Sequence, residues 1–110
     1  QNLHYDLYIS MPDAVLGNKV DIPTVSGKAR IKIDPGTQAG KILRLRNKGL
    51  PSLDSYGTGD LLIHINVWTP QELSAKYRSM FEEMQKDDSF SPTPGKGDKS
   101  FFDKVKEMFS

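Results

Sequence analysis

The sequence contains no cysteine, and this absence excludes several kinds of site at once. Disulfides, thiolate nucleophiles, and zinc or iron–sulfur centres built on sulfur all require that side chain. An excess of one charge is also missing, because 15 lysines and arginines stand against 14 aspartates and glutamates. A formal net charge of +1 gives the chain no bulk electrostatic attraction for a polyanion, so charge does not argue for a nucleic-acid partner.

Long apolar runs are missing as well. No segment approaches the roughly 20 apolar residues that span a membrane, and residues 1–10 lack the basic stretch and apolar block of a secretory signal. We therefore expect a soluble, cytoplasmic protein with no membrane partner. The 110 residues suit one domain, and the lack of an initiator methionine suggests a fragment of a longer protein.

Catalytic groups are scarce. His4 and His64 are the two histidines, and neither has a serine or a carboxylate at a spacing that indicates a catalytic triad or a metal site. Residues 36–42, "GTQAGKI", resemble a phosphate-binding loop but have one residue too few between the glycines and lack the magnesium-binding Ser or Thr. We expect no enzyme, and no cofactor or metal within this chain.

Alternating apolar and polar residues predict β-strands in the first two thirds of the chain. The pattern covers residues 6–11, 20–24, 28–33, 43–46 and 61–68. One helical turn is expected at 13–16, and a hairpin turn at Ser26-Gly27.

The period changes at Thr69, where a helix over residues 70–86 is predicted. Thr69 is expected at the N-cap, Pro70 at the first helical position and Glu72 at the third, which together form a capping box. Apolar residues then recur at spacings of three and four and form one stripe. These residues are Leu73, Tyr77, Met80, Phe81 and Met84.

Residues 87–99 are rich in Asp, Ser, Pro and Gly and predict a flexible linker after a β-rich domain of residues 1–86. Residues 100–110 predict a short C-terminal helix with much apolar surface. Its apolar residues are Phe101, Phe102, Val105, Met108 and Phe109. An isolated helix of this length is marginal in water, so it needs a surface on which to dock.

Five stretches, taken in order, carry a resemblance to a known family. They are "DLYISMPDAVLG" at 6–17, "VDIPTVSG" at 20–27, "DPGTQAGKILRLRNKGLP" at 34–51, "GDLLIHINVWTP" at 59–70 and "KSFFDKVKEMF" at 99–109. The set resembles the second C-terminal β-domain and the dimerisation segment of the DnaJ family, the bacterial J-domain co-chaperones of the heat-shock response. Ser26 departs from the family, which often has an acidic residue there.

The resemblance implies a mainly β fold, a two-layer sandwich-like domain followed by an amphipathic helix and a short C-terminal helix. It also implies a protein that holds unfolded polypeptide clients and delivers them to a DnaK-type chaperone. The family's His-Pro-Asp tripeptide and its CxxCxGxG repeats do not occur in this chain. The J-domain is therefore expected outside it, and zinc either belongs elsewhere in the parent protein or the parent is a subtype that lacks the zinc module.

In this family the C-terminal region carries the dimer contact. We therefore hypothesise a two-fold interface built from the five stripe residues of the predicted helix and the five apolar residues of the tail. The tail can instead fold back onto its own domain, and part of the helical stripe is expected to cover the sheet.

The family also suggests a site for clients. An unfolded segment can add a strand at a sheet edge, here residues 20–24, with Leu16, Val20 and Ile22 as pocket candidates. Ordinary core positions are the alternative for each of the three, and Pro23 limits how far a ladder can extend.

A nucleic-acid-binding β-domain is the contrasting interpretation. It would use the densest basic group in the chain, Lys41, Arg44, Arg46 and Lys48. No aromatic stacking residue lies among them, so a solvated strand face explains these residues better.

Overall fold

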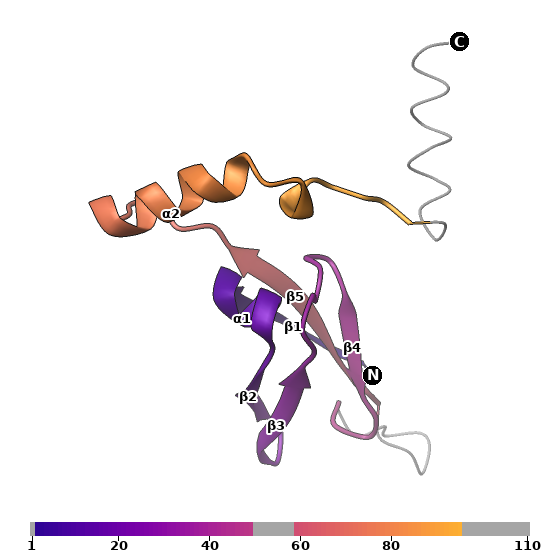
Figure 1. The fold of residues 1–110 in the computed structure, drawn as a ribbon. Helices are drawn as coiled ribbons and strands as arrows, with labels where there is room; N and C mark the ends of the chain where they lie inside the picture. Colours follow the sequence, from indigo (N-terminus) through magenta and orange to yellow (C-terminus); the bar gives the residue numbers. More distant parts are fainter. Residues whose placement is uncertain (1, 50–58, 96–110) are drawn as a thin grey trace. The chain divides into compact units, whose positions relative to one another are not determined.

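The computed structural model describes residues 2–49 and 59–95, in two compact units, Gln1–Pro70 and Gln71–Ser110. The elements of the first unit are β1 (Leu3–Ser10), α1 (Met11–Leu16), β2 (Asn18–Thr24), β3 (Gly27–Ile33), β4 (Ile42–Leu45) and β5 (Leu61–Trp68) (Figure 1). The second unit contains α2 (Ala75–Gln85) and a 3-10 turn, η1 (Asp88–Phe90). The mainly β fold with short helices is confirmed.

Two sheets form the first unit. In the three-stranded sheet, β5 lies between β1, which is parallel to it, and β4, which is antiparallel. The second sheet is the antiparallel hairpin of β2 and β3. The parallel pair joins Leu3 to Leu61 and Ser10 to Trp68, so the two ends of this unit lie side by side in one sheet.

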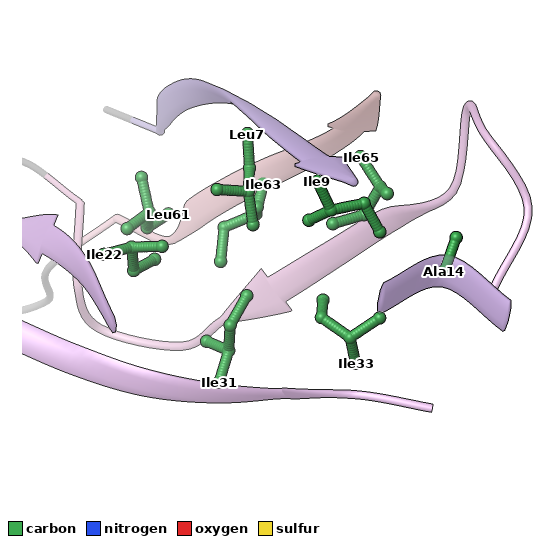
Figure 2. Close-up of a cluster of buried hydrophobic side chains, with 9 residues drawn as sticks. All are labelled: Leu7, Ile9, Ala14, Ile22, Ile31, Ile33, Leu61, Ile63 and Ile65. Carbon is green, nitrogen blue, oxygen red and sulfur yellow. The ribbon is translucent and has the colours of Figure 1, made fainter. Parts of the chain in front are cut away.

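The core lies between the two sheets. Alternation places every second side chain of a strand on one face, and in β5 this buries Ile63 and Ile65 completely. Side chains from both sheets point toward one another in Figure 2, with Ala14 of α1 at one end. The buried residues are Leu7, Ile9, Ala14, Ile22, Ile31, Ile33, Leu61, Ile63 and Ile65. This arrangement confirms the predicted two layers.

The first helix is short and well capped. The predicted turn at 13–16 is confirmed within a helix that begins earlier, at Met11, because the Ser10 hydroxyl accepts a hydrogen bond from the Asp13 amide at 3.1 Å. Gly17 ends the helix with φ +83°, a conformation that favours glycine. A Cβ added there would lie 2.8 Å from the Ile33 carbonyl oxygen, so the close approach of α1 to the end of β3 also requires glycine.

The hairpin turn lies one residue earlier than predicted. Val25 and Ser26 occupy the turn, and Gly27 already pairs with Thr24 as the first residue of β3. Gly27 takes φ +139°, which the absence of a side chain permits. The glycine therefore follows the turn and does not form part of it.

The predicted start of the second helix was wrong. The structure begins α2 at Ala75, with Ser74 as the N-cap, whereas the sequence pattern favoured Thr69 and Pro70. The Ser74 hydroxyl accepts a hydrogen bond from the Tyr77 amide at 3.3 Å, and Leu73 consequently lies before the helix. The capping-box pattern is a local signal, and Ser74 is a second capping residue that satisfies an amide closer to the apolar stripe, that of Tyr77.

This cap leads to a first prediction. Replacing Ser74 by alanine is expected to destabilise α2 by about 1 kcal/mol, because an orphan amide of the first turn loses its acceptor. Thr69→Ala is the matched control and should leave helicity unchanged. Far-ultraviolet circular dichroism during thermal unfolding measures the difference, and an effect of Thr69→Ala as large as that of Ser74→Ala would contradict the observed cap.

Part of the predicted linker has regular structure. Asp87 caps η1 by accepting hydrogen bonds from the backbone and the hydroxyl of Ser89, at 2.8 and 2.7 Å. These two bonds, the side-chain one first, lower the pKa of Asp87. The rest of the predicted linker from residue 96 and the predicted helix at 100–110 lie outside the described residues. Within the described ranges, no helix is long and apolar enough to cross a membrane.

Candidate functional site

A mostly apolar cavity lies where the start of β1 meets the end of β2. It is open to solvent, and its volume of about 300 Å³ is at the lower end of the range for sites that bind small molecules. The residues that line it are Leu3, His4, Tyr5, Pro23, Thr24, Val25, Lys48 and Leu61. The cavity therefore draws on both sheets, at the end of the core that carries the hairpin turn.

The outer edge of β2 adjoins this cavity through Pro23. A two-residue turn closes on a hydrogen-bonded pair, here Thr24 with Gly27, and bonded and non-bonded pairs then alternate along the ladder. Pro23 is thus at a non-bonded position, where its missing amide hydrogen does not interrupt pairing with β3. Lys19 and Asp21 are also at non-bonded positions of this ladder, so their backbone amide and carbonyl groups face away from β3.

No strand of the described segments pairs with that outer edge. The Lys19 amide donates to Oδ1 of Asn18 at 2.7 Å. The edge therefore offers the amide hydrogen of Asp21 and the carbonyl oxygens of Lys19, Asp21 and Pro23 to an added strand. An extended peptide beside β2 would reach the cavity where Pro23 lines it. The arrangement combines backbone hydrogen bonding with one apolar recess.

The three predicted pocket residues do not line this cavity. Ile22 is 1% exposed and belongs to the core. Val20 is half-buried and packs against the core. Leu16 is 74% exposed at the end of α1, away from the lining residues. The core alternative holds for Ile22, because its side chain faces the opposite sheet.

Sequence reasoning missed Leu3, Tyr5, Pro23 and Val25 as lining residues. They come from β1 and from the end of the hairpin, and only the packing of the two sheets brings them together. One signal was present in the sequence, since Val25 is an apolar residue in a turn, where polar residues are usual. The structure leaves 59% of Val25 exposed.

An ion pair links the two strands of the hairpin beside this edge. Arg30 donates from Nε to Oδ1 of Asp21 at 2.9 Å, across a directly opposed pair of residues. The hydrogen bond from Arg30 is the main cause that lowers the pKa of Asp21. A carboxylate with a lowered pKa stabilises the folded state above its ordinary pKa and loses that contribution as the pH falls.

A second prediction follows for Asp21. Asp21→Asn is expected to lower stability slightly near neutral pH, and the difference from the unmodified chain should shrink as the pH falls below the ordinary value of 3.8. The effect is small because both partners are exposed. Urea titrations at pH 6 and pH 3 measure it, with Asp6→Asn as the control. A difference that grows toward pH 3 would contradict the assignment.

Within the described part of the second unit, the apolar stripe of α2 remains largely exposed. No residue of the helix is buried, Tyr77 is 50% and Met80 43% exposed, and Phe81 and Met84 are half-buried. A helix with this much exposed apolar surface needs a partner surface in water. Leu73, the remaining predicted stripe residue, precedes the helix and is 37% exposed.

A hollow of about 190 Å³ extends this stripe toward η1. Met80, Glu83, Met84, Asp87 and Phe90 line it. Phe90 was assigned to the linker by its polar neighbours, and the structure brings this exposed ring next to the stripe. The five predicted interface residues of the tail lie outside the described residues, namely Phe101, Phe102, Val105, Met108 and Phe109.

The basic residues do not form one uniform patch. Arg44 is the one member of the group within β4, and its Nε lies 3.2 Å from Oδ2 of Asp60. Lys48 lines the apolar cavity. Asp60 is held in place because its Oδ1 accepts a hydrogen bond from the Asn47 amide at 3.0 Å. The charge available to a phosphate backbone is therefore divided and partly neutralised.

The part of the chain that the structure describes contains no group of three or more His, Cys, Asp or Glu residues arranged to hold a metal ion. The zinc module implied by the resemblance depends on cysteine thiolates, which this sequence does not contain. The chain's own residues therefore do not fit that module.

The chain is similar to one protein family and to several bacterial proteins. The family model described as DnaJ C terminal domain matches residues 1–70. Chaperone protein DnaJ of Salinibacter ruber is 49% identical over 111 residues, which cover 99% of this chain and 29% of that protein. Chaperone protein DnaJ of Bacteroides thetaiotaomicron is 47% identical over 108 residues, which cover 98% of this chain and 27% of that protein.

A third relative, Chaperone protein DnaJ of Porphyromonas gingivalis, is 50% identical over 92 residues that cover 84% of this chain. The chain spans less than a third of the length of these relatives. The matched family model ends at residue 70, where the first compact unit also ends. The family model matches that whole unit, and these relatives are 47% to 50% identical to the chain over most of its length. The chain therefore belongs to the DnaJ C-terminal domain family.

Proposed function

We propose that this chain is the part of a DnaJ-type co-chaperone that binds unfolded polypeptide segments and joins two copies of the parent protein. Family membership supports a chaperone role. The observation that carries client binding is the apolar cavity between β1 and β2, at the end of an unpaired strand edge. Neither the cavity nor the edge requires a cofactor or a catalytic group.

An extended client would lie along the outer edge of β2. Backbone hydrogen bonds to Asp21 and to the Lys19 carbonyl oxygen would hold it without regard to its sequence, and an apolar side chain would enter the cavity. Pro23 lacks an amide hydrogen, so the ladder is short and binding is weak. Weak and loosely selective capture suits a protein that holds many different unfolded segments and then releases them.

Dimerisation rests on the uncovered stripe of α2. Burying one Phe or Met side chain stabilises an interface by roughly 1.5 to 3 kcal/mol. Several such residues from each of two chains offset the loss of free tumbling and the ordering of side chains. Residues 100–110 would complete this interface, because their apolar groups need a docking surface as much as the stripe does.

Delivery to a DnaK-type chaperone belongs to the parent protein. The His-Pro-Asp tripeptide of the J-domain is absent from this sequence, so stimulation of an ATPase would come from outside this chain. In this proposal the chain acts in the cytoplasm and catalyses no reaction. It supplies a client-binding site and, by joining two copies of the parent protein, a second such site. Two linked client sites would raise the effective concentration of one site for a client held at the other.

A charge placed in the cavity tests the client site, and this is a third prediction. Val25→Asp is expected to weaken binding of an unstructured, apolar-rich fluorescent peptide about tenfold, because burying a valine is worth about 1.5 kcal/mol. Ser26→Asp adds the same charge to the next residue, outside the lining, and is the matched control. Fluorescence anisotropy measures both affinities.

Equal weakening by the two substitutions would attribute the effect to charge alone and would contradict the cavity. In the same assay, the dependence of binding on salt distinguishes apolar client binding from nucleic-acid binding. Apolar capture holds or strengthens as sulfate is added, whereas contact with phosphates weakens steeply with salt. An oligonucleotide that competes with the peptide at low salt and loses its effect at high salt would favour the basic residues.

A further inference from the structure

The polar residues that line the apolar cavity have one property in common. They are His4, Tyr5, Thr24 and Lys48, and the side chain of each can donate a hydrogen bond. The lining residues include no aspartate and no glutamate. The cavity therefore combines apolar walls with hydrogen-bond donors and one positive charge, and it has no acidic side chain to balance that charge.

The ammonium group of Lys48 has no acidic partner within residues 2–49 and 59–95. Asp60, which comes just before β5, is already engaged with other groups. Its Oδ2 lies 3.2 Å from Nε of Arg44, and its Oδ1 accepts a hydrogen bond from the Asn47 amide at 3.0 Å. Lys48 is exposed, so its charge is available to an anion that comes from outside the chain.

We propose that the cavity captures the C-terminus of an unfolded polypeptide, with its last apolar side chain in the recess and its terminal carboxylate paired with Lys48. Such capture depends on the proposed client binding at β2, and it adds which part of a client is held. Charge complementarity selects this occupant, because every polypeptide ends in a carboxylate on the same residue as its last side chain. The ammonium group donates a charge-assisted hydrogen bond to that carboxylate, and strand addition supplies the backbone contacts.

The location of the cavity fixes the direction of the bound segment. Strand β2 runs from Asn18 to Thr24, and the cavity lies at the Thr24 end. A segment whose last residue enters the cavity therefore runs parallel to β2, with its preceding residues beside Asp21 and Lys19. Each residue added after the apolar one would move the carboxylate about 3.3 Å further along the strand, away from Lys48.

Fluorescence anisotropy of the full chain with two N-terminally labelled peptides tests the site. Both peptides have the same unstructured, uncharged sequence ending in leucine, and one has a free carboxylate whereas the other has a C-terminal amide. The free acid is expected to bind about fivefold more tightly at low salt, because the pair with Lys48 is exposed to solvent. Lys48→Gln should reduce the affinity for the acid to that for the amide. Lys41→Gln removes the same charge outside the lining and should keep the preference.

Equal binding of acid and amide by the unmodified chain would overturn the capture of chain ends while leaving client binding intact. A preference that survives Lys48→Gln would overturn it as well. An amidated peptide with aspartate just before the leucine serves as a third probe. If it binds as tightly as the free acid, Lys48 recognises acidic side chains, and capture of chain ends is wrong. If neither of the first two peptides binds, client binding at β2 fails, and the capture fails with it.

Discussion

Replacing Ile63 by alanine is expected to lower the free energy of unfolding of the β-rich unit by about 2 to 5 kcal/mol. Ile63 is fully buried in the middle of the central strand, between a parallel neighbour and an antiparallel one. Its side chain faces Ile22, Ile31 and Ile33 of the other sheet across the core (Figure 2). Truncation removes apolar contact and leaves a cavity that the two close-packed sheets cannot fill without rearranging.

Ile42→Ala is the matched control for this substitution. Ile42 is also in the three-stranded sheet, next to β5, but it is on the outer face and 52% exposed. Its truncation should cost less than about 1 kcal/mol. Urea unfolding at one fixed protein concentration gives both values, since association of the chain would otherwise shift them. Equal costs at the two positions would contradict the placement of the core between the sheets.

Two charges on the stripe of α2 are expected to have the next largest effect. Tyr77→Asp combined with Met80→Asp should weaken self-association roughly a hundredfold or more, because interface residues of this type often contribute 2 kcal/mol or more each. Tyr77 and Met80 are the two most exposed large apolar side chains of the helix. Sedimentation equilibrium over a range of concentrations measures the dissociation constant.

Ser79→Asp is the control for the helix substitutions. Ser79 lies on the opposite side of α2 from the stripe, about 200° around the helix from Tyr77, and it is exposed. This variant should associate like the unmodified chain. A chain truncated after Pro94 provides the complementary test of the tail. If the truncated and full chains sediment as the same species, the tail contributes nothing to the dimer, and the stripe alone remains to be tested.

The strands could be predicted from the sequence because each strand buries one face, and this produces a direct alternation of apolar and polar residues. Leu61, Ile63 and Ile65 show the period without interruption. The parallel pairing of β1 with β5 could not be predicted, because the paired residues Leu3 and Leu61 are far apart in the chain and no local pattern joins them. The two-sheet arrangement came from the resemblance to the family and not from periodicity.

Local signals were less reliable at the ends of elements. The Thr69 capping pattern predicted a helix start five residues before the observed one at Ala75, because Ser74 offers an equivalent cap. Ile22 shows the same limit in the candidate site. Alternation correctly placed its side chain on one face of β2, but it did not distinguish a surface pocket from the fully buried core.

The cavity was beyond sequence reasoning for a physical reason. Its lining residues come from positions as distant as Leu3 and Leu61, and Tyr5 and Pro23 meet only after the two sheets have packed. The composition of each segment alone is ordinary for a strand or a turn. The edge of β2 was predicted as the client site, with pocket residues near the α1 end of that strand. The apolar cavity in the structure lies at the hairpin end instead.

Client contact at this edge is measured most directly by nuclear magnetic resonance on the isotope-labelled chain. As an unstructured, apolar-rich peptide is added, the amide signals of Leu3, Tyr5, Lys19, Asp21 and Val25 are expected to shift together and saturate at one affinity. Signals of Trp68 and His64, on the outer face of the other sheet, should stay in place. Saturable shifts confined to that outer face or to α2, with the edge of β2 unchanged, would contradict client binding at the cavity.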